Sequence, residues 1–233
     1  MNKYLIFLLA LTVNFSFSQS ASISSRNDFS NSRTLMSNNG LWITNSTASS
    51  EIKGTPYLFD SWNSDNALIY MSDNRAYKIR SINYNVQLER FEAKFAEDSV
   101  LALNPKNIKK IDINSRTFKR YLDPQYQRNS YFEELVKTKS LTILRKFETE
   151  IVEGNFNPMT QQKITPDQMV KIEKYYSTED GETLSEMKLS KGAILKLIDS
   201  DKKDAVKQHA KDNSLNYKDI NDLKAIIKYY NTL

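Results

Sequence analysis

A group of basic side chains between positions 106 and 120 is the first feature of the sequence that could bind a ligand. An exposed cluster of cations would attract anionic lipid headgroups, a polyanionic glycan or an acidic protein surface. An ordinary solvated face of a β-sheet is the alternative interpretation of the same residues. The predicted anion-binding residues are Lys106, Lys109, Lys110, Arg116, Lys119 and Arg120.

Carboxylate catalysis needs two acids that lie close together in different environments. Glu133 and Glu134 are adjacent on an expected strand, so their side chains point to opposite faces. Glu148 and Glu150 share a face, but they fall at the end of an expected strand, where solvent would surround them. The only histidine, His209, lies in the middle of an expected helix. We therefore predict no catalytic residue and expect that the protein is not an enzyme.

The amino-acid counts exclude several common kinds of metal and cofactor site. The chain has no cysteine and one histidine, and its five glycines are all more than six residues apart. These counts exclude disulfides, thiolate metal sites, two-histidine zinc sites and glycine-rich phosphate-binding loops. We therefore expect no cofactor and no metal site.

The first eighteen residues have the pattern of a secretory signal peptide. Lys3 supplies the charged start, Tyr4–Val13 the apolar region, and Ser16-Phe17-Ser18 the small residues that a signal peptidase reads. A membrane anchor is the alternative, but the apolar run is shorter than the ~20 residues that a membrane span needs. We predict cleavage after Ser18 and export to the periplasm or to the outer membrane as an associated protein.

Export limits the partners that the mature chain can meet. Nucleic acid is not an expected partner outside the cytoplasm. The absence of cysteine excludes a lipid-modified N-terminal cysteine, so the protein is not expected to be a lipoprotein. No segment after residue 18 is long and apolar enough to be expected to span a membrane.

The elements that must position any site are mostly strands. Between Ala67 and Leu122, Tyr77 and Ile79 alternate with basic residues, and Phe91 and Phe95 belong to a second alternating run. Short turns separate these runs, and no long helical pattern falls between them. Such spacing indicates an antiparallel sheet rather than parallel βαβ units.

Further strands follow this stretch. Tyr131–Lys137 and Leu141–Glu150 predict a hairpin, and Glu179-Asp180-Gly181-Glu182 predicts another tight turn. We therefore expect a mainly β domain over residues 54–189, an antiparallel meander that forms a sandwich or a partly open barrel. With a helical end, the chain would be α+β overall.

Residues 19–53 are rich in Ser, Asn and Thr, and such a segment buries too little apolar surface to offset the entropy of ordering. We predict a flexible tether. Leu41-Trp42-Ile43 is the exception, and it could form an edge strand of the sheet or a docking peptide for a partner.

The pattern changes to helical periodicity at Ser190, which is a good N-cap. We predict a helical appendage over residues 190–233 that packs on one face of the sheet and is the part most suited to meet a partner. Three helices of about ten residues each are too short to persist alone in water. The predicted partner-binding residues are Ile220, Leu223, Ile227, Tyr229 and Tyr230 of the last helix, together with Trp42.

The order of these elements resembles that of a loose group of uncharacterised exported proteins of Bacteroidota-type Gram-negative bacteria. The resemblance implies localisation and architecture, and it implies no activity. Asp98-Ser99-Val100 is also similar to the three-residue O-glycosylation acceptor of such bacteria, which makes Ser99 a candidate for modification; a turn into a strand is the alternative. The segments that carry the resemblance are Ser18-Gln19, Gly54-Thr55-Pro56-Tyr57-Leu58-Phe59, Asn83-Tyr84-Asn85, Tyr131-Phe132-Glu133-Glu134-Leu135-Val136, Asp222-Leu223 and Tyr229-Tyr230-Asn231.

Together these features predict a non-catalytic exported protein of the cell envelope, an accessory or scaffold subunit that docks on another periplasmic or outer-membrane component. One alternative is a lipid- or glycan-binding carrier of barrel-like shape, whose apolar lumen would be lined by Phe91, Phe95 and Phe118. The other alternative is an enzyme that acts on glycan with carboxylates alone.

Overall fold

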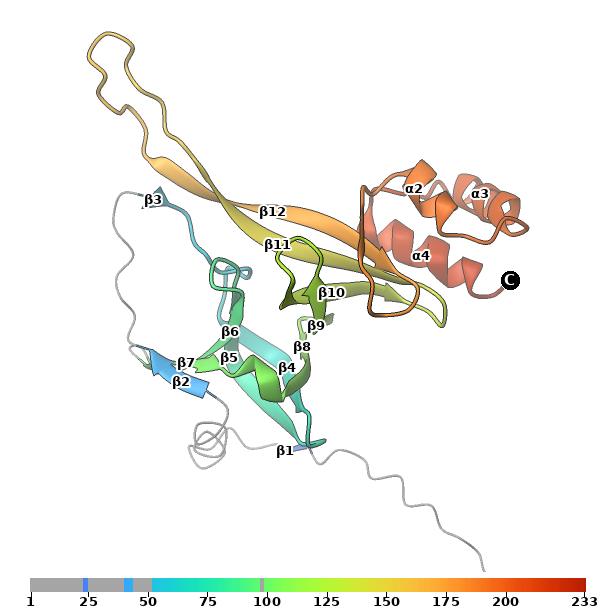
Figure 1. The fold of residues 1–233 in the computed structure, drawn as a ribbon, viewed down its shortest axis with the longest axis horizontal. Coiled ribbons are helices and arrows are strands. Elements are labelled where there is room, and N and C mark those ends of the chain that lie inside the picture. Colours follow the sequence, from blue (N-terminus) through green and yellow to red (C-terminus); the bar gives the residue numbers. More distant parts are fainter. Residues whose placement is uncertain (1–22, 25–39, 44–51, 97–98) are drawn as a thin grey trace, which may run out of the picture.

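The computed structural model describes residues 23–24, 40–43, 52–96 and 99–233, without the side chains of residues 23–24 and 63–66. A single 13-stranded, mostly antiparallel sheet forms most of this part of the chain, and three helices follow it (Figure 1). The prediction of a mainly β, α+β protein with a helical C-terminal end is therefore confirmed. The predicted signal peptide lies outside the described residues.

The sheet is open, with the strand order β13-β12-β11-β10-β9-β8-β4-β5-β6-β7-β2. β1 and β3 lie off this path and pair in parallel with β5 and β12. The strands of the first part are β1 (Ile23–Ser24), β2 (Gly40–Ile43), β3 (Ile52–Lys53), β4 (Asn63–Met71), β5 (Ala76–Asn85), β6 (Arg90–Ala96), β7 (Ser99–Leu103), β8 (Ile108–Ile113) and β9 (Arg116–Asp123). Those of the second part are β10 (Arg128–Lys137), β11 (Thr142–Val152), β12 (Asp167–Thr178) and β13 (Ser185–Met187).

Alternating apolar residues on these strands build the main hydrophobic core. The sheet curves, so that side chains from β4 to β9 meet Tyr131 of β10 and Phe147 of β11. The rings of Phe91 and Phe118 lie 5.3 Å apart in this core, and Phe95 packs against its edge. The three residues that the carrier hypothesis placed around an apolar lumen, Phe91, Phe95 and Phe118, thus pack in or against this core.

β11 and β12 form a continuous antiparallel ladder from Thr142–Thr178 to Val152–Gln168. β10 pairs with β11 only as far as Arg145, and β13 pairs with β12 only at Tyr175–Ser177. Beyond this covered part the hairpin projects from the rest of the sheet, and β3 contacts it at Asp167 and Gln168 (Figure 1). We call residues 149–171 the hairpin arm.

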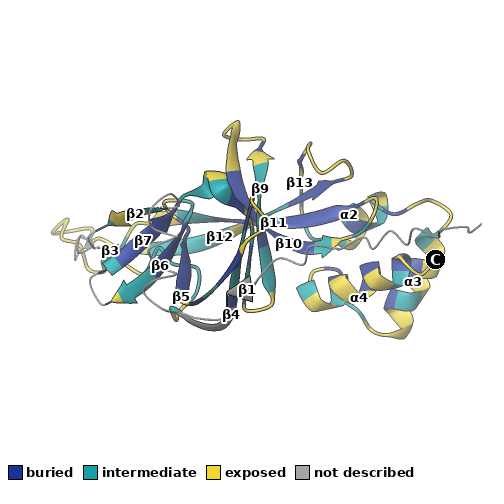
Figure 2. Cartoon of the chain, turned by 90° about the horizontal axis from the view of Figure 1, so that it is seen from below, coloured by how far each residue is buried: buried dark blue, intermediate teal, exposed yellow. Residues whose placement is uncertain are grey.

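The three helices are α2 (Lys191–Lys196), α3 (Lys203–Asp212) and α4 (Ile220–Tyr230). Ser190 caps α2 as predicted, because its Oγ accepts a hydrogen bond from the Ala193 amide at 3.2 Å. The buried faces of the helices form a second core with Leu135, Leu141 and Ile143 of the β10–β11 hairpin, while their other faces are exposed (Figure 2). The helices therefore pack on the sheet, as expected for helices too short to be stable alone.

The structure differs from the sequence-based expectation in three places. The polar sequence of residues 63–66 predicts a turn, but these residues belong to β4. Helical periodicity predicts that Ala205 points inward, but it is exposed on α3. Within the expected tether 19–53, the strands β1, β2 and β3 pair with the sheet, because main-chain hydrogen bonds do not require apolar side chains. Gly40 allows this approach, since a Cβ atom there would lie 2.7 Å from the carbonyl oxygen of Ala102.

Candidate functional site

The predicted partner-binding residues of α4 lie mostly inside the molecule. Leu223 and Ile227 are completely buried and Tyr230 is nearly so, all in the second core. Ile220 and Tyr229 are half-buried, and the Tyr229 ring stacks on His209 with 3.9 Å between centroids. This face of α4 covers the sheet, and it is not an open surface for a partner.

Trp42, in contrast, remains accessible. It lies on β2 at one end of the sheet, where β2 pairs with β7, and its ring contacts Phe95 edge-on at 5.7 Å. Trp42 is 49% exposed and Leu41 is 77% exposed. Ser99, the candidate for modification, is the half-buried first residue of β7, and Asp98 lies outside the described residues.

The predicted basic cluster does not form one cationic surface. Lys106 and Lys109 are exposed, whereas carboxylates neutralise three of the other four cations. The fourth, Arg120, donates hydrogen bonds to the carbonyl oxygens of Pro105 and Asn129. The three ion pairs are Lys110–Asp112 at 2.6 Å, Arg116–Glu133 at 2.7 Å and Lys119–Glu134 at 2.9 Å.

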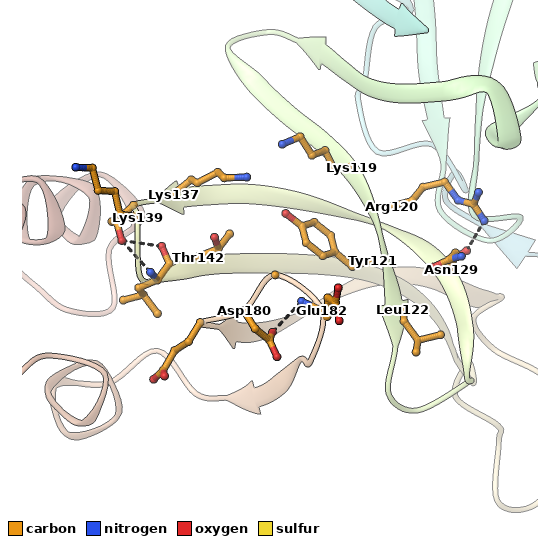
Figure 3. Close-up of a pocket in the computed structure, with 14 residues that line it drawn as sticks. Lys119, Arg120, Tyr121, Leu122, Asn129, Lys137, Lys139, Thr142, Asp180 and Glu182 are labelled. Atoms are coloured by element: carbon orange, nitrogen blue, oxygen red, sulfur yellow. Dashed lines mark hydrogen bonds between the residues drawn. The ribbon is translucent and has the colours of Figure 1, made fainter. Parts of the chain in front are cut away.

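Lys119 and Arg120 line a groove of about 600 Å³ between β9, the β10–β11 turn and the β12–β13 turn. Figure 3 shows Tyr121 at its centre, with Lys119 and Lys137 on one side and Asp180 and Glu182 on the other. Half of its fourteen lining residues are charged, so the groove is polar. Those residues are Lys119, Arg120, Tyr121, Leu122, Asn129, Lys137, Thr138, Lys139, Leu141, Thr142, Glu179, Asp180, Gly181 and Glu182.

Glu134 fixes the floor of this groove. The Tyr121 hydroxyl donates a 2.5 Å hydrogen bond to its carboxylate, and the Lys119 ammonium lies 2.9 Å away. Burial alone would raise the pKa of Glu134, but the hydrogen bonds from Tyr121 and Lys119 outweigh it and lower the pKa below its usual range. The carboxylate stays ionised and holds the tyrosine ring in one orientation.

The opposite wall is the turn that the sequence predicted. The Asp180 carboxylate accepts hydrogen bonds from the amides of Glu182 and Thr183 and from the Thr178 hydroxyl. These hydrogen bonds lower the pKa of Asp180. Gly181 has a φ of 79°, a conformation that favours glycine. Asp180 is thus occupied in shaping the turn.

A fully buried lysine forms the centre of a second charged cluster. The Lys146 ammonium lies 2.5 Å from Asp123, 3.0 Å from Glu148 and 3.4 Å from Glu89. Lys146 and Asp123 have no exposed side-chain surface. Lys174 also contacts Glu148 at 2.8 Å. Arg128 pairs with Glu89 at 3.1 Å, so three cations compensate the three carboxylates of this site.

The pKa values of this cluster favour the ionised forms. Burial alone would raise the pKa of Asp123, but the hydrogen bond from Lys146 and the amides of Gln125 and Tyr126 lower it overall. Burial opposes the charge of Lys146 as well, and its hydrogen bonds to Asp123 and Glu148 raise its pKa nonetheless. Asp123 and Lys146 are therefore both charged at neutral pH.

A third charged cluster lies on the other face of β10. Arg116 and Arg145 both bind the buried Glu133, each through two hydrogen bonds, and Arg145 also pairs with Glu173. Glu133 and Glu134 thus point to opposite faces, as the sequence predicted. Each of the two carboxylates has its own cations.

Exposed apolar residues gather at the end of the hairpin arm. Met159 is 94% exposed, and Ile151, Val152, Phe156 and Ile164 are exposed as well. All five lie within fourteen residues of sequence. The sequence alone gives no reason to single out these apolar residues, because their exposure depends on which strands stop short of the arm.

Among the described residues, no group of three or more His, Asp or Glu side chains is placed to hold a metal ion. In the same part of the chain, no helix has the length and apolar character to cross a membrane. Comparison with family models, with curated proteins and with solved structures found no match.

The sequence missed the Lys146 cluster entirely. Its members come from the β5–β6 turn, the end of β9 and the middle of β11, so no local motif marks them. The only available signal was a lysine between Leu144 and Phe147 in a strand expected to be half-buried. Such a lysine needs nearby carboxylates if its strand is covered on both faces.

Proposed function

We propose that this chain is a non-catalytic, exported subunit of the cell envelope that docks on another protein. The observation that carries the proposal is the distribution of exposed apolar surface. Five of the twelve large hydrophobic residues that are exposed in the described part lie on the hairpin arm, between Ile151 and Ile164. A concentrated apolar patch is typical of an interaction site, whereas scattered exposed residues need no explanation.

The charged clusters support a non-catalytic role. A general acid needs a carboxyl group whose pKa is raised toward neutrality. Asp123, Glu134 and Glu148 instead have pKa values lowered by bound cations and hydrogen-bond donors, despite their burial. Export is supported by the charged start, the apolar region and the small residues up to Ser18.

The groove favours a second candidate function, the binding of a glycan. Its lining includes Tyr121, which Glu134 holds in place, together with Asn129, Thr142 and both kinds of charge. Sugars combine an apolar ring face with hydroxyl groups, so this mixture of groups suits them. In this view the protein recruits a glycan to the docked complex.

Fractionation of the source cells tests the main proposal. We expect the chain in the periplasmic or outer-membrane fraction, with a mass that begins at Gln19, and in native electrophoresis as part of a complex larger than itself. A cytoplasmic chain that keeps Met1, or one that migrates only as a monomer, would contradict the proposal.

A further inference from the structure

The end of the hairpin arm is a well-built loop. Phe156 and Lys163 form an isolated antiparallel bridge. Inside it, the Asn157 amide donates to the Gln162 carbonyl and the Gln161 amide donates to the Asn157 carbonyl, both at 2.8 Å. The Asn157 side chain accepts a hydrogen bond from the Met159 amide at 2.9 Å. The loop therefore presents Met159 from a defined backbone, which lowers the entropy lost when a partner binds.

The base of the loop is equally constrained. The Gly154 amide donates to the Asp167 carboxylate, and the Asn155 amide donates to the Thr165 hydroxyl, both at 2.8 Å. A Cβ atom at Gly154 would lie 1.8 Å from the Thr165 carbonyl oxygen, so only glycine allows the two sides of the hairpin to approach here. The two sides of the loop, which carry Phe156 and Ile164, are thus held close together at its base.

The charges around the tip argue against an anionic membrane surface as the occupant. Glu153 and Lys163 are the only charged residues between Ile151 and Pro166, and Lys163 is paired with Asp167 at 2.6 Å. A segment that binds anionic headgroups carries a cluster of unpaired basic residues. Residues 151–166 contain no such cluster of basic residues.

The uncharged polar residues of the apex argue against insertion into lipid chains. Thr160, Gln161 and Gln162 are exposed beside Met159. In a hydrocarbon layer these side chains would lose their water without gaining hydrogen-bond partners. An apolar centre with an uncharged polar rim is instead the anatomy of a protein–protein interface.

A second copy of the chain offers no matching surface in the groove described above. Seven of the fourteen residues that line it are charged, including Lys119, Lys137 and Asp180. An apolar, nearly neutral tip does not complement such a groove, because its insertion would take charges out of water without pairing them.

We propose that the tip of the hairpin arm inserts into an apolar, uncharged groove of a different protein, with Phe156, Met159 and Ile164 as the anchors. The inference rests on the proposed docking function and names the contact that makes it. The Thr160, Gln161 and Gln162 side chains hydrogen-bond the rim of that groove.

The test compares two variants of the full chain, expressed in the source cells and extracted natively. The tip variant carries Phe156→Ser and Met159→Ser; the control carries Leu88→Ser, which removes an exposed apolar residue from the β5–β6 turn. We expect the tip variant to lose at least tenfold of the complex while the purified protein keeps its melting temperature, and the control to keep both. If the double variant melts earlier, Met159→Ser alone replaces it, because Met159 is 94% exposed.

Each other outcome overturns the inference in a distinct way. A wild-type chain without any larger complex overturns the proposed function itself. A complex that survives the tip variant leaves that function standing and shows that the contact lies elsewhere. Two measurements on the purified protein assign the tip to another occupant: tip-dependent sedimentation with phosphatidylcholine–phosphatidylglycerol vesicles, or a dimer in gel filtration that the tip variant separates.

Discussion

The β11–β12 hairpin has two parts that share one ladder but have different surroundings. In the covered part, β10 pairs with Thr142–Arg145, β13 pairs with Tyr175–Ser177, and the helices pack on Leu141 and Ile143. In the arm, the same two strands continue with much less cover and end in exposed apolar residues. The comparison teaches that the neighbours of a strand, and not its own pairing, decide whether its apolar residues stabilise the fold or remain free to bind.

A substitution at the junction between the two parts should cause the largest loss in the free energy of unfolding. Lys146 follows the last residue of β11 that pairs with β10, and it neutralises the buried Asp123. We expect Lys146→Met to lower the free energy of unfolding by about 3–5 kcal/mol, because it leaves a buried carboxylate without a counter-charge. Urea denaturation at pH 7 measures the change.

Asp123→Asn, added to Lys146→Met, is the control for this explanation. The double variant should regain part of the lost stability, since the uncompensated charge is then gone. A loss below about 1 kcal/mol in the single variant would mean that Asp123 relaxes to water, and that the junction is no more rigid than the arm.

The next largest effect should be the difference in stability between two variants, one at a buried isoleucine and one at an exposed isoleucine. Ile227 is completely buried over the covered part, and Ile164 is 64% exposed on the arm. Ile227→Ala should lower the free energy of unfolding by about 2–5 kcal/mol through lost burial and a cavity. Ile164→Ala should change it by less than about 0.5 kcal/mol. Equal losses in thermal or urea unfolding would contradict the division of the hairpin into two parts.

The smallest expected effect is the loss of stability toward urea at low pH. Asp123, Glu134 and Glu148 have pKa values that are lowered in the folded state. Their contribution is therefore complete above the unfolded-state pKa values of about 4, and it is lost as the pH falls through the lower folded-state values. We expect the urea midpoint to stay level from pH 7 to about pH 5 and to fall below about pH 4.

Lys146→Met should flatten this acid response, because two of the three carboxylates contact Lys146. A midpoint that rises as the pH is lowered from 5 to 3 would show that these carboxylates are strained rather than stabilised by their surroundings.

The sequence predicted those features that depend on neighbours along the chain. The alternation at Tyr77 and Ile79, the Asp180-Gly181 turn and the Ser190 cap all appear where their local chemistry placed them. The sequence predicts the apolar stripe of α4, but an apolar stripe does not indicate what covers it. The structure puts Leu223 and Ile227 against the sheet, and they are not free for a partner.

Local sequence patterns could not predict the features that depend on contacts between residues far apart in the sequence. Asp123 and Lys146 meet because β9 and β11 flank β10, a pairing that neither segment encodes alone. Likewise, the cations of Lys110, Arg116 and Lys119 suggested an anion site, whereas the fold supplies each with a carboxylate. The arm can be recognised only from the structure, in which the pairing of β11 with β10 stops at Arg145.

The parallel contact of β3 with β12 has a consequence for the order of folding. It joins Ile52 to Asp167, which are 115 residues apart, whereas a loop of only 14 residues, 153–166, joins β11 and β12. Contacts between distant residues form slowly because they close a long loop. The N-terminus of the chain emerges first during synthesis, so Ile52 cannot pair with Asp167 until Asp167 has emerged. The arm should therefore fold as a hairpin before β3 pairs with its base. Until that step, β12 would be exposed to other newly synthesised proteins.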